Sequence, residues 1–343
     1  MSPTASKALR VAVSLALAAL LLWVFLKNLD MRAVGDAIGK ARPGWVVVAV
    51  VTSIVMIPIR SWRWTWLLRT VGKVRQRDAN VATCIGFAAT TLLPARAGEV
   101  VRPVALSRLA RVPLAPSVLS ILIERLLDLL SVLVLFIVYA LGGFAPAEVG
   151  GDASARLDLL RRSALVLGVV TAVALVVMSA LGRRPEAAMR FLEPFLAKLP
   201  RRFADRLRSL ASHLLAALQP LETARDAAVL AASSAALWLV ICFQIHATLL
   251  AFDLRFPYPV TFFVLAWAVL GLAIPTPGGV GGYHAAVAYC LTGFYAVPAA
   301  TAAAFAVVAH AISFVPITIL GLLFLGASGL SLGKLREDGA APT

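Results

Sequence analysis

Charged residues are scarce in this chain of 343 residues: Asp, Glu, Lys and Arg make up 14% of it, against 61% hydrophobic residues. Soluble domains average about 25% charged and about 45–50% apolar residues. Several uncharged stretches reach the ~20 residues with which a helix crosses ~30 Å of hydrocarbon. The clearest is 163–182, SALVLGVVTAVALVVMSALG, and the stretches 227–252 and 297–330 are longer. The composition excludes an ordinary soluble domain and predicts an all-α, polytopic membrane protein.

Cysteine and histidine are also rare. The three cysteines form no C-x-x-C pair and lie inside hydrophobic segments, which argues against a disulfide framework or a zinc site and favours buried thiols; they are Cys84, Cys242 and Cys290. The four histidines are scattered, so we interpret each as a lone polar residue and predict no metal site; they are His213, His246, His284 and His310.

Recognisable catalytic motifs are missing as well. The chain contains no G-x-x-x-x-G-K-[ST] loop for ATP phosphates, no H-E-x-x-H and no G-x-S-x-G. No segment alternates strands with helices as a soluble α/β domain would. We therefore expect a single transmembrane domain over residues 1–343, with no catalytic residues and no cofactor, and we do not expect an enzyme.

The formal net charge of +15 follows the loops of a membrane protein. The N-terminus, 60–77, 96–111, 183–225 and the C-terminus contain 23 of the 32 Lys and Arg residues, and the alternate loops contain 8. Because positive charge accumulates on the cytoplasmic side, this asymmetry predicts that both termini are cytoplasmic. The basic balance is thus explained by topology and anionic lipids, and we expect no nucleic-acid partner.

Hydropathy then predicts six full spans and two broken elements. The first span follows Lys7 and Arg10 and has no cleavage site after it, so we interpret it as retained. The spans are about 8–26, 45–62, 116–142, 163–182, 227–252 and 299–328.

The apolar segment 78–93 is short, ends at a proline and has basic loops on both sides, so residues 78–112 are predicted to re-enter from the cytoplasm, with 78–93 going in and 94–112 returning. Residues 259–295, split by IPTPGGVGG at 274–282, form either a hairpin from the opposite face or two short spans, which would give eight helices. Irregular backbone at membrane depth is tolerated where protein buries it or a watery cavity hydrates it. Such paired breaks often mark a transporter's binding site, and kinked helices are the simpler alternative.

A further segment, about 186–221, is amphipathic, with leucine and phenylalanine at helical spacing and arginine on the other faces. It is predicted either to lie in the cytoplasmic membrane interface or to pack beneath the bundle.

Three charges interrupt the predicted third span, LSILIERLLDLLSVLVL at 119–135. Glu124 and Asp128 are four residues apart and share a helix face, and Arg125 precedes Asp128 by three, so these two can pair. Ionisable groups at this depth are expensive and usually functional. The alternative is a salt bridge that fixes this helix to a neighbour.

The stretch TLLPARAGEVVRP at 91–103 holds a second group of charges. Pro94 ends one half of the broken element, and Gly98 permits a turn that a side chain would block. On a helix, Glu99 and Arg102 would share a face, with Arg96 on or near it. Arginine suits bidentate recognition of phosphate, so these residues predict a headgroup site. The alternative is ordinary positive-inside anchoring.

In order and spacing, LLPARAGEVVRP, ERLLD and PTPGGVGG resemble the lysylphosphatidylglycerol synthase transmembrane family, the flippase-like domain of the multiple peptide resistance factors, over roughly residues 8–330. The resemblance implies a bacterial inner-membrane protein that handles lipids. Its characteristic positions correspond to Pro94, Arg96, Gly98, Glu99, Arg102, Glu124, Arg125, Asp128, Pro277, Gly278, Gly279 and Gly281.

The chain departs from the family pattern in two places: Thr91 replaces a common Asn, and His284 replaces the acidic residue usual after the second break. The chain also stops at Thr343 without the aminoacyl-transferase domain of the resistance factors, so we do not expect synthase activity.

The function expected from these patterns is a flippase-like translocator for a phospho-, aminoacyl-, glyco- or isoprenoid-type lipid. Arg96, Arg102 and Arg125 would bind anionic headgroups, and Glu99, Glu124 and Asp128 would balance them or relay protons. Expected partners are membrane lipids, with a homo-oligomer or a separate lipid-synthesising protein left open. The alternatives are an intramembrane enzyme that transfers a group between lipids and an ion-coupled transporter of small solutes.

Overall fold

The structure, a computed structural model, describes residues 3–27, 29–69, 71–93, 98–144, 153–217, 223–274, 276–333 and 335. Within these ranges it is entirely helical, with thirteen α-helices and one short 3-10 helix, which confirms the all-α expectation. Each of the six predicted spans corresponds to one long helix: α1 (Pro3–Leu26), α3 (Pro43–Leu67), α6 (Leu114–Leu141), α7 (Ala153–Arg183), α10 (Ala224–Ala251) and α13 (Ala299–Ala327).

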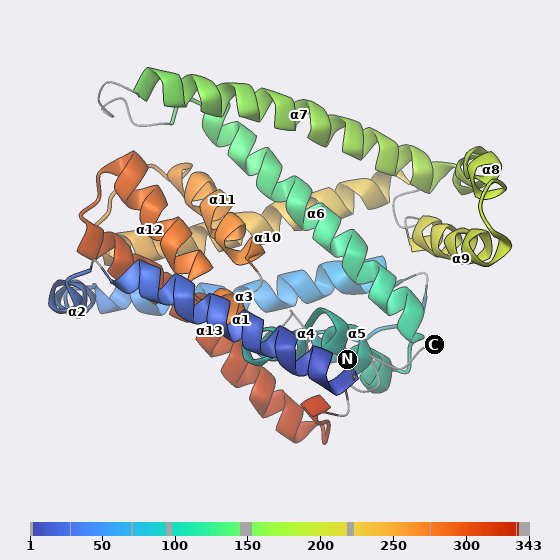
Figure 1. Ribbon diagram of the computed structural model, residues 1–343, viewed down its shortest axis with the longest axis horizontal. Coiled ribbons are helices and arrows are strands. Elements are labelled where there is room, and N and C mark those ends of the chain that lie inside the picture. Colours follow the sequence, from blue (N-terminus) through green and yellow to red (C-terminus); the bar gives the residue numbers. More distant parts are fainter. Residues whose placement is uncertain are drawn as a thin grey trace.

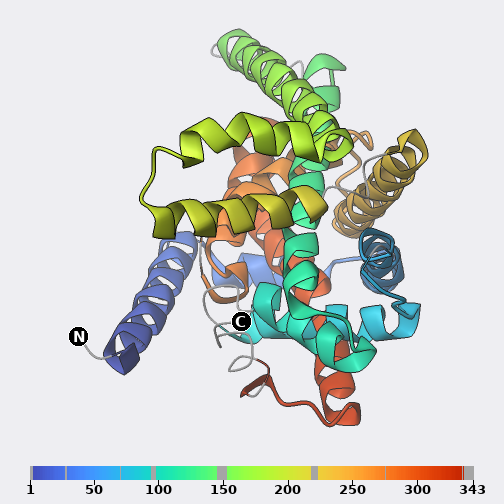
Figure 2. The same cartoon turned by 90° about the vertical axis from the view of Figure 1, so that its right-hand side faces the viewer.

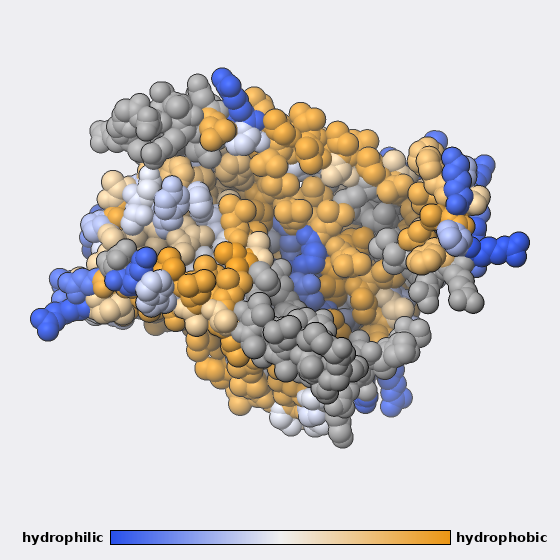
Figure 3. All heavy atoms as spheres, in the orientation of Figure 1, coloured by the Kyte–Doolittle hydropathy of each residue, from blue (hydrophilic) through white to orange (hydrophobic). Residues whose placement is uncertain are grey.

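The surface of these helices is that of a membrane protein. Helices α3, α10 and α13 are long and apolar enough to cross a membrane by length and composition. Helix α7, at the edge of the bundle in Figure 1, turns Val166, Val169 and Val176 outward with 64–68% of each residue exposed. Figure 3 shows hydrophobic side chains over much of this face. Because large apolar groups face outward along whole helices, the protein is membrane-embedded.

Two pairs of shorter helices fill the middle of the bundle. One pair is α4 (Gln76–Leu92) and α5 (Gly98–Ala110); the other is α11 (Val260–Ala273) and α12 (Gly282–Tyr295), joined through the 3-10 turn η3 (Pro277–Gly279). Figure 1 places the pairs in opposite halves of the molecule. Their tips meet where Gly278 faces Thr91, since a Cβ added to Gly278 would lie 3.5 Å from the Thr91 carbonyl oxygen.

Glycine is needed for the close crossing of α4 and α5. A Cβ on Gly98 would overlap the carbonyl oxygen of Gly86 and the side chain of Thr90. A Cβ on Gly86 would in turn lie 2.6 Å from the Cβ of Arg102. Gly98 therefore permits a close approach of two helices; the turn predicted here falls on residues 94–97, which lie outside the described residues.

The predicted amphipathic segment is two helices, α8 (Pro185–Leu196) and α9 (Arg201–Ala217), which lie side by side at one end of the molecule (Figure 2). Phe191 and Phe203 are 70% and 62% exposed. Arg208 of α9 donates to Glu193 of α8 at 2.6 Å, and this hydrogen bond lowers the pKa of the Glu193 carboxyl.

The helix α2 (Met31–Gly39), which the sequence analysis did not predict, lies at the opposite end in Figure 1. The Asp30 side chain caps it by accepting hydrogen bonds from the backbone of Arg32 and Ala33.

Helix α6 links the two largest hydrophobic cores. Ile121 belongs to a core made with α3, α4 and α5, and Val132 belongs to a core made with α10, α11, α12 and α13. Residues 124–128 lie between them on the same helix, about 15 Å from its first residue at 1.5 Å per residue. The charges of α6 are therefore held where two apolar cores adjoin.

Candidate functional site

Glu124 of α6 is the centre of a buried cluster of charged residues. Its Oε1 accepts hydrogen bonds from Arg102 Nη1 at 2.7 Å, Arg125 Nη2 at 3.0 Å and Arg60 Nη1 at 3.2 Å. Arg63 Nη2 lies 3.7 Å from the same oxygen. Four guanidinium groups therefore surround a carboxylate whose side chain is fully buried.

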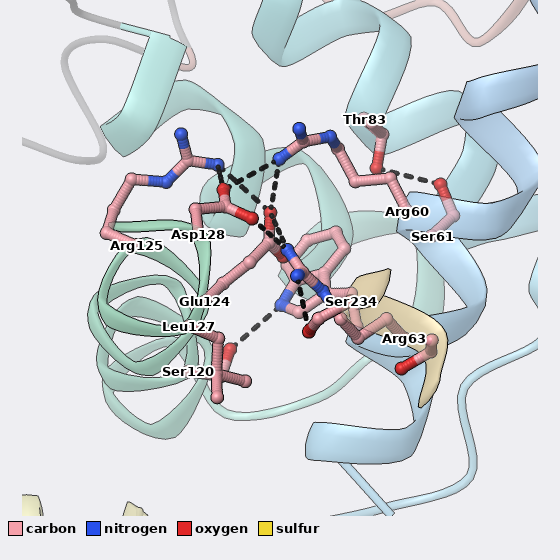
Figure 4. A network of polar contacts seen from close by, with 12 residues as sticks. Arg60, Ser61, Arg63, Thr83, Ser120, Glu124, Arg125, Leu127, Asp128 and Ser234 are labelled. Carbon is pink, nitrogen blue, oxygen red and sulfur yellow. Dashed lines mark hydrogen bonds and ion pairs between the residues drawn. The ribbon is translucent and has the colours of Figure 1, made fainter. Parts of the chain in front are cut away.

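Asp128, one helical turn further along, accepts from three of these four cations. Its Oδ1 receives Arg63 Nη2 at 2.6 Å, and its Oδ2 receives Arg60 Nη1 at 3.0 Å and Arg125 Nη2 at 3.1 Å. Trp238 of α10 adds an indole N–H at 3.2 Å. Figure 4 shows Arg60 and Arg63 reaching from α3, and Arg125 from α6, toward the two carboxylates. The predicted pairing of Arg125 with Asp128, and the shared face of Glu124 and Asp128, are observed.

The positions of Arg60 and Arg63 correct the sequence analysis, which assigned both to a basic loop at 60–77. Helix α3 continues to Leu67, and the two side chains are 5% and 0% exposed. The guanidinium of Arg60 lies over the ring of Phe87, 5.6 Å from its centroid, and Arg63 Nη1 donates to Ser234 at 2.9 Å. The available signal was the stretch RSWRWTW at 60–66, which has no helix breaker and places the two arginines three residues apart on one face.

Arg102 is the headgroup-binding candidate of α5 that the structure brings into the cluster. Its guanidinium stacks on Trp64 at 4.0 Å from the ring centroid, and Trp64 is fixed by an N–H bond of 2.8 Å to Ser120. Its carboxylate partner is Glu124, which is 22 residues away in the sequence, and not Glu99, which is only three residues away. Glu99 lies within electrostatic range of Arg125.

The remaining predicted residues fall in two places. Pro94 and Arg96 lie outside the described residues. The glycines of the second break adopt positive φ angles, and His284 follows them in the first turn of α12, where its Nδ1 accepts from the Gly281 N–H at 3.2 Å. These residues belong to the tip of the α11–α12 pair and stand apart from the arginine cluster; they are Pro277, Gly278, Gly279, Gly281 and His284.

Positive charge exceeds negative charge in this cluster. Four arginines face two carboxylates, and Glu99 would still leave one arginine uncompensated. Arginine keeps its proton in proteins, so the excess cannot be removed by deprotonation. Several buried polar atoms also lack a hydrogen-bond partner: Nε of Arg60, Arg63, Arg102 and Arg125, Nη2 of Arg102 and Oε2 of Glu124. Such a cluster has the charge and the free donors to bind an anion.

The cluster is reached through Arg125, whose side chain is 40% exposed while the other members are 9% exposed or less. Figure 3 shows hydrophilic atoms set back among hydrophobic ones near the middle of this face, between the positions of α6 and α1 in Figure 1. Within the described ranges, no group of three or more His, Cys, Asp and Glu is placed to hold a metal ion. The three described cysteines are free and buried, as predicted.

Fold and site together define a helical membrane protein with a buried, arginine-rich charge cluster between its two main cores. The model of the family described as "Lysylphosphatidylglycerol synthase TM region" matches residues 11–321, and the chain belongs to this family. The family resemblance inferred from the sequence motifs is thereby confirmed.

The chain is also 26% identical, over 359 aligned positions, to a protein of Haloferax volcanii named glycosyltransferase AglD. The alignment covers 98% of this chain and 57% of the relative, so the chain spans little more than half of the relative's length. This similarity contradicts the expectation that the chain is not an enzyme, because a protein similar to nearly all of it is named for group transfer.

Proposed function

We propose that the arginine cluster binds the anionic headgroup of a membrane lipid and that the protein moves this lipid between the two leaflets. The main support for this proposal is the excess of buried guanidinium groups over carboxylates. In addition, the Nε and Nη2 atoms of Arg102 have no hydrogen-bond acceptor. A phosphate or another anionic group would supply both the missing negative charge and the missing acceptors.

A lipid suits the surroundings of this site better than a free anion. The cluster lies between two apolar cores, and the partly exposed Arg125 gives a route to it from a largely apolar face. A headgroup would thus enter beside α6 while its acyl chains remain in hydrocarbon. The arginine side chains are already removed from water by folding. Binding therefore adds little desolvation cost on the protein's side, and only the headgroup has to lose its hydration.

The two broken elements offer a way for the bound headgroup to pass. We propose that α4–α5 and α11–α12 are re-entrant pairs from opposite faces of a bacterial cytoplasmic membrane, among six full spans. The α8–α9 end would be cytoplasmic because most basic residues of the chain lie in the segments that we assign to that side. The α4–α5 and α11–α12 pairs are in contact at Thr91 and Gly278. We propose that loss of this contact exposes the cluster to the second leaflet.

Lipid exchange in proteoliposomes tests this proposal. Purified protein is reconstituted with fluorescent phosphatidylglycerol or phosphatidylcholine, and an impermeant quencher reports the lipid in the outer leaflet. We expect exchange of the anionic lipid to be faster than in protein-free vesicles, and Arg102→Gln to slow it about tenfold or more, the equivalent of ~1.4 kcal/mol from one charge-assisted contact. Arg208→Gln, which alters an exposed arginine of α9, serves as the matched control.

The proposal fails if the wild-type protein accelerates no anionic lipid tested. It also fails if Arg102→Gln and Arg208→Gln proteins, both verified as folded by gel filtration and thermal unfolding, exchange lipid at the wild-type rate. Glycolipid and aminoacyl-lipid probes in the same assay identify the preferred headgroup.

Transfer of a group to or from a lipid is the second candidate, and two observations favour it. One is the similarity to a protein named as a glycosyltransferase. The other is Glu124 Oε2, a buried carboxylate oxygen without a hydrogen-bond partner, which has the position to accept a hydrogen bond from a hydroxyl of a bound headgroup and so orient it. Family membership fits a lipid-related flippase or transferase equally.

Mass spectrometry of membrane lipids distinguishes the candidates. A deletion strain is complemented with wild-type protein or with Glu124→Gln. Loss of a lipid species in both the deletion and the Glu124→Gln strain supports transfer. An unchanged set of species with an altered distribution between leaflets supports translocation.

A further inference from the structure

Two histidines hold the turn that joins α11 to α12. His284 Nδ1 accepts a hydrogen bond from the Gly281 N–H at 3.2 Å, and His310 Nε2 bonds the Gly278 carbonyl oxygen at 2.7 Å. The imidazole centroids are 4.6 Å apart, although the residues come from different helices, α12 and α13. The sequence analysis interpreted each as a lone polar residue, so their contact is a finding of the structure.

The surroundings of this pair are uncharged. From 256 to 333 the chain contains no Asp, Glu, Lys or Arg, and its only histidines there are these two. Tyr283 is the other titratable side chain in ring contact with the pair, and Phe25 of α1 and Phe314 of α13 complete the rings around it. Lys27, which directly follows α1, has its ammonium over the Trp23 ring, and α4 contributes the uncharged Thr91.

The hydrogen bonds fix where protons are in this conformation. A carbonyl oxygen only accepts, so His310 Nε2 carries a hydrogen. A backbone N–H only donates, so His284 Nδ1 carries none. A proton added to His284 Nδ1 would face the Gly281 N–H and abolish that bond. A charge on both rings is further disfavoured by repulsion across 4.6 Å in apolar surroundings.

The turn that these histidines hold touches two other elements. A Cβ on Gly281 would lie 2.6 Å from the Cβ of Leu21 in α1, and Gly278 adjoins Thr91 at the end of α4. Thr91 accepts a hydrogen bond of 3.2 Å from Thr318 of α13. A displacement of this turn would therefore change the contact between Gly278 and Thr91, where the two helix pairs meet.

We propose that His284 and His310 form a proton-binding site whose protonation releases the 276–282 turn from the end of α4, so that proton binding drives the movement of the bound lipid. This inference rests on the function proposed above and adds its energy source. Because linkage is reciprocal, a conformation in which the turn is released binds the proton more tightly than the conformation described here.

Histidine-selective NMR tests the proton site without any lipid transport. The protein has four histidines, so ¹⁵N-histidine labelling in lipid nanodiscs gives few signals, which His284→Gln and His310→Gln assign. We expect His284 to be unprotonated at Nδ1 at neutral pH, and its protonation to coincide with faster hydrogen exchange of the 276–282 amides after correction for intrinsic rates. Protonation of His284 with unchanged exchange, or no protonation down to the pH of unfolding, overturns the proposal.

An imposed pH gradient tests the coupling. With one proton carried per lipid, the steady-state leaflet ratio of the anionic probe should shift about tenfold per pH unit of gradient. His284→Gln keeps an oxygen that can accept from Gly281 but cannot titrate near neutral pH, so it should retain exchange without a gradient and lose the gradient-driven shift. His246→Gln, on α10 and outside the pair, should keep the shift.

The outcomes separate the two proposals. If no lipid moves in any of the proteoliposome measurements, with or without a pH gradient, the proposed function is wrong. The NMR experiment tests the proton site independently of that result. Proton coupling is wrong if the leaflet ratio in the wild-type protein does not depend on the pH gradient. It is also wrong if the ratio depends on the gradient equally in His284→Gln. Neither result contradicts the proposed headgroup site.

Discussion

At the scale of single residues, the arginine cluster combines two energetic roles. Glu124 and Asp128 bind α6 to α3 and α5 through hydrogen-bonded ion pairs, so they stabilise the helix arrangement. The same pairs leave positive charge and free N–H groups, so the stabilisation is incomplete without an anion. Residues that hold the fold together are thus also the residues that we propose to bind the ligand.

Loss of one carboxylate should be costly here. Asp128→Asn removes the charge that faces Arg60, Arg63 and Arg125, and breaking a buried pair typically costs about 3–5 kcal/mol. We expect thermal unfolding in detergent at a clearly lower temperature than for the wild-type protein. Anionic lipid added to the detergent should recover part of the loss.

Asp253→Asn is the matched control, because Asp253 pairs with Arg42 on the surface, where both side chains are 50% or more exposed. A pair of this kind contributes at most about 1 kcal/mol. Equal stability of the two variants would contradict the role assigned to Asp128.

Sequence reasoning identified part of this cluster and missed part of it. Glu124, Arg125 and Asp128 were predictable because charges inside an apolar run are conspicuous and their spacing fixes a helix face. Arg60 and Arg63 were missed because arginines at the end of an apolar run ordinarily mark the membrane surface. The bond from Arg102 to Glu124 depends on how α5 packs on α6, which local spacing does not determine.

At the scale of helices, the crossing of α4 and α5 positions Arg102. The helices approach closely because Gly86 and Gly98 lack side chains, and Gly86 adjoins the Cβ of Arg102. The glycines of the broken element therefore act through packing against the neighbouring helix.

Gly98→Ala should disturb this crossing. The new methyl group would overlap the backbone of Gly86 and the side chain of Thr90, and overpacking typically costs about 1–3 kcal/mol. We expect both a lower free energy of unfolding and weaker binding of anionic lipid, measured by chemical denaturation and native mass spectrometry, because α5 must shift with Arg102.

Gly35→Ala in α2 provides the comparison, since no atom lies within 4 Å of the added Cβ. Alanine inside an exposed helix is better than glycine by up to about 1 kcal/mol. Destabilisation by Gly35→Ala as large as that by Gly98→Ala would show that helix glycines matter for a reason other than the close crossing.

Helix ranges were more predictable than helix partners. Long apolar runs located the six long helices, since hydrocarbon thickness and the rise per residue leave little choice, but α7 begins at Ala153, ten residues before its predicted start. Helix α2 escaped because nine residues carry little periodic signal, although Asp30 is a typical cap. Pro200 directly precedes α9, whereas Pro194 lies inside α8 without ending it.

At the scale of the whole molecule, the two ends differ in charge. Helices α8 and α9 with 69–77 form a basic end, and α2 with the 253–258 turn forms the other end, where Arg42 and Arg255 are paired with Asp253. From the positive-inside rule we propose that the basic end faces the cytoplasm.

Cysteine labelling checks this orientation. The native cysteines are 0–2% exposed and should remain silent, so Asp36→Cys in α2 and Arg190→Cys in α8 each provide one accessible thiol. An impermeant maleimide should label Asp36→Cys in intact cells and Arg190→Cys only after the membrane is permeabilised. The reverse pattern would invert the proposed topology.

The contact of Thr91 with Gly278 has a consequence for ion permeability. If each helix pair reaches only to the middle of the bilayer, the contact between their tips is the thinnest barrier to ions in the protein. The methyl group of Thr91 and the backbone of Gly278 form part of this barrier. The Thr91–Gly278 contact would then determine how easily small ions cross the protein. If a lipid passes there, the contact must form again after each passage, because otherwise the membrane voltage would be lost.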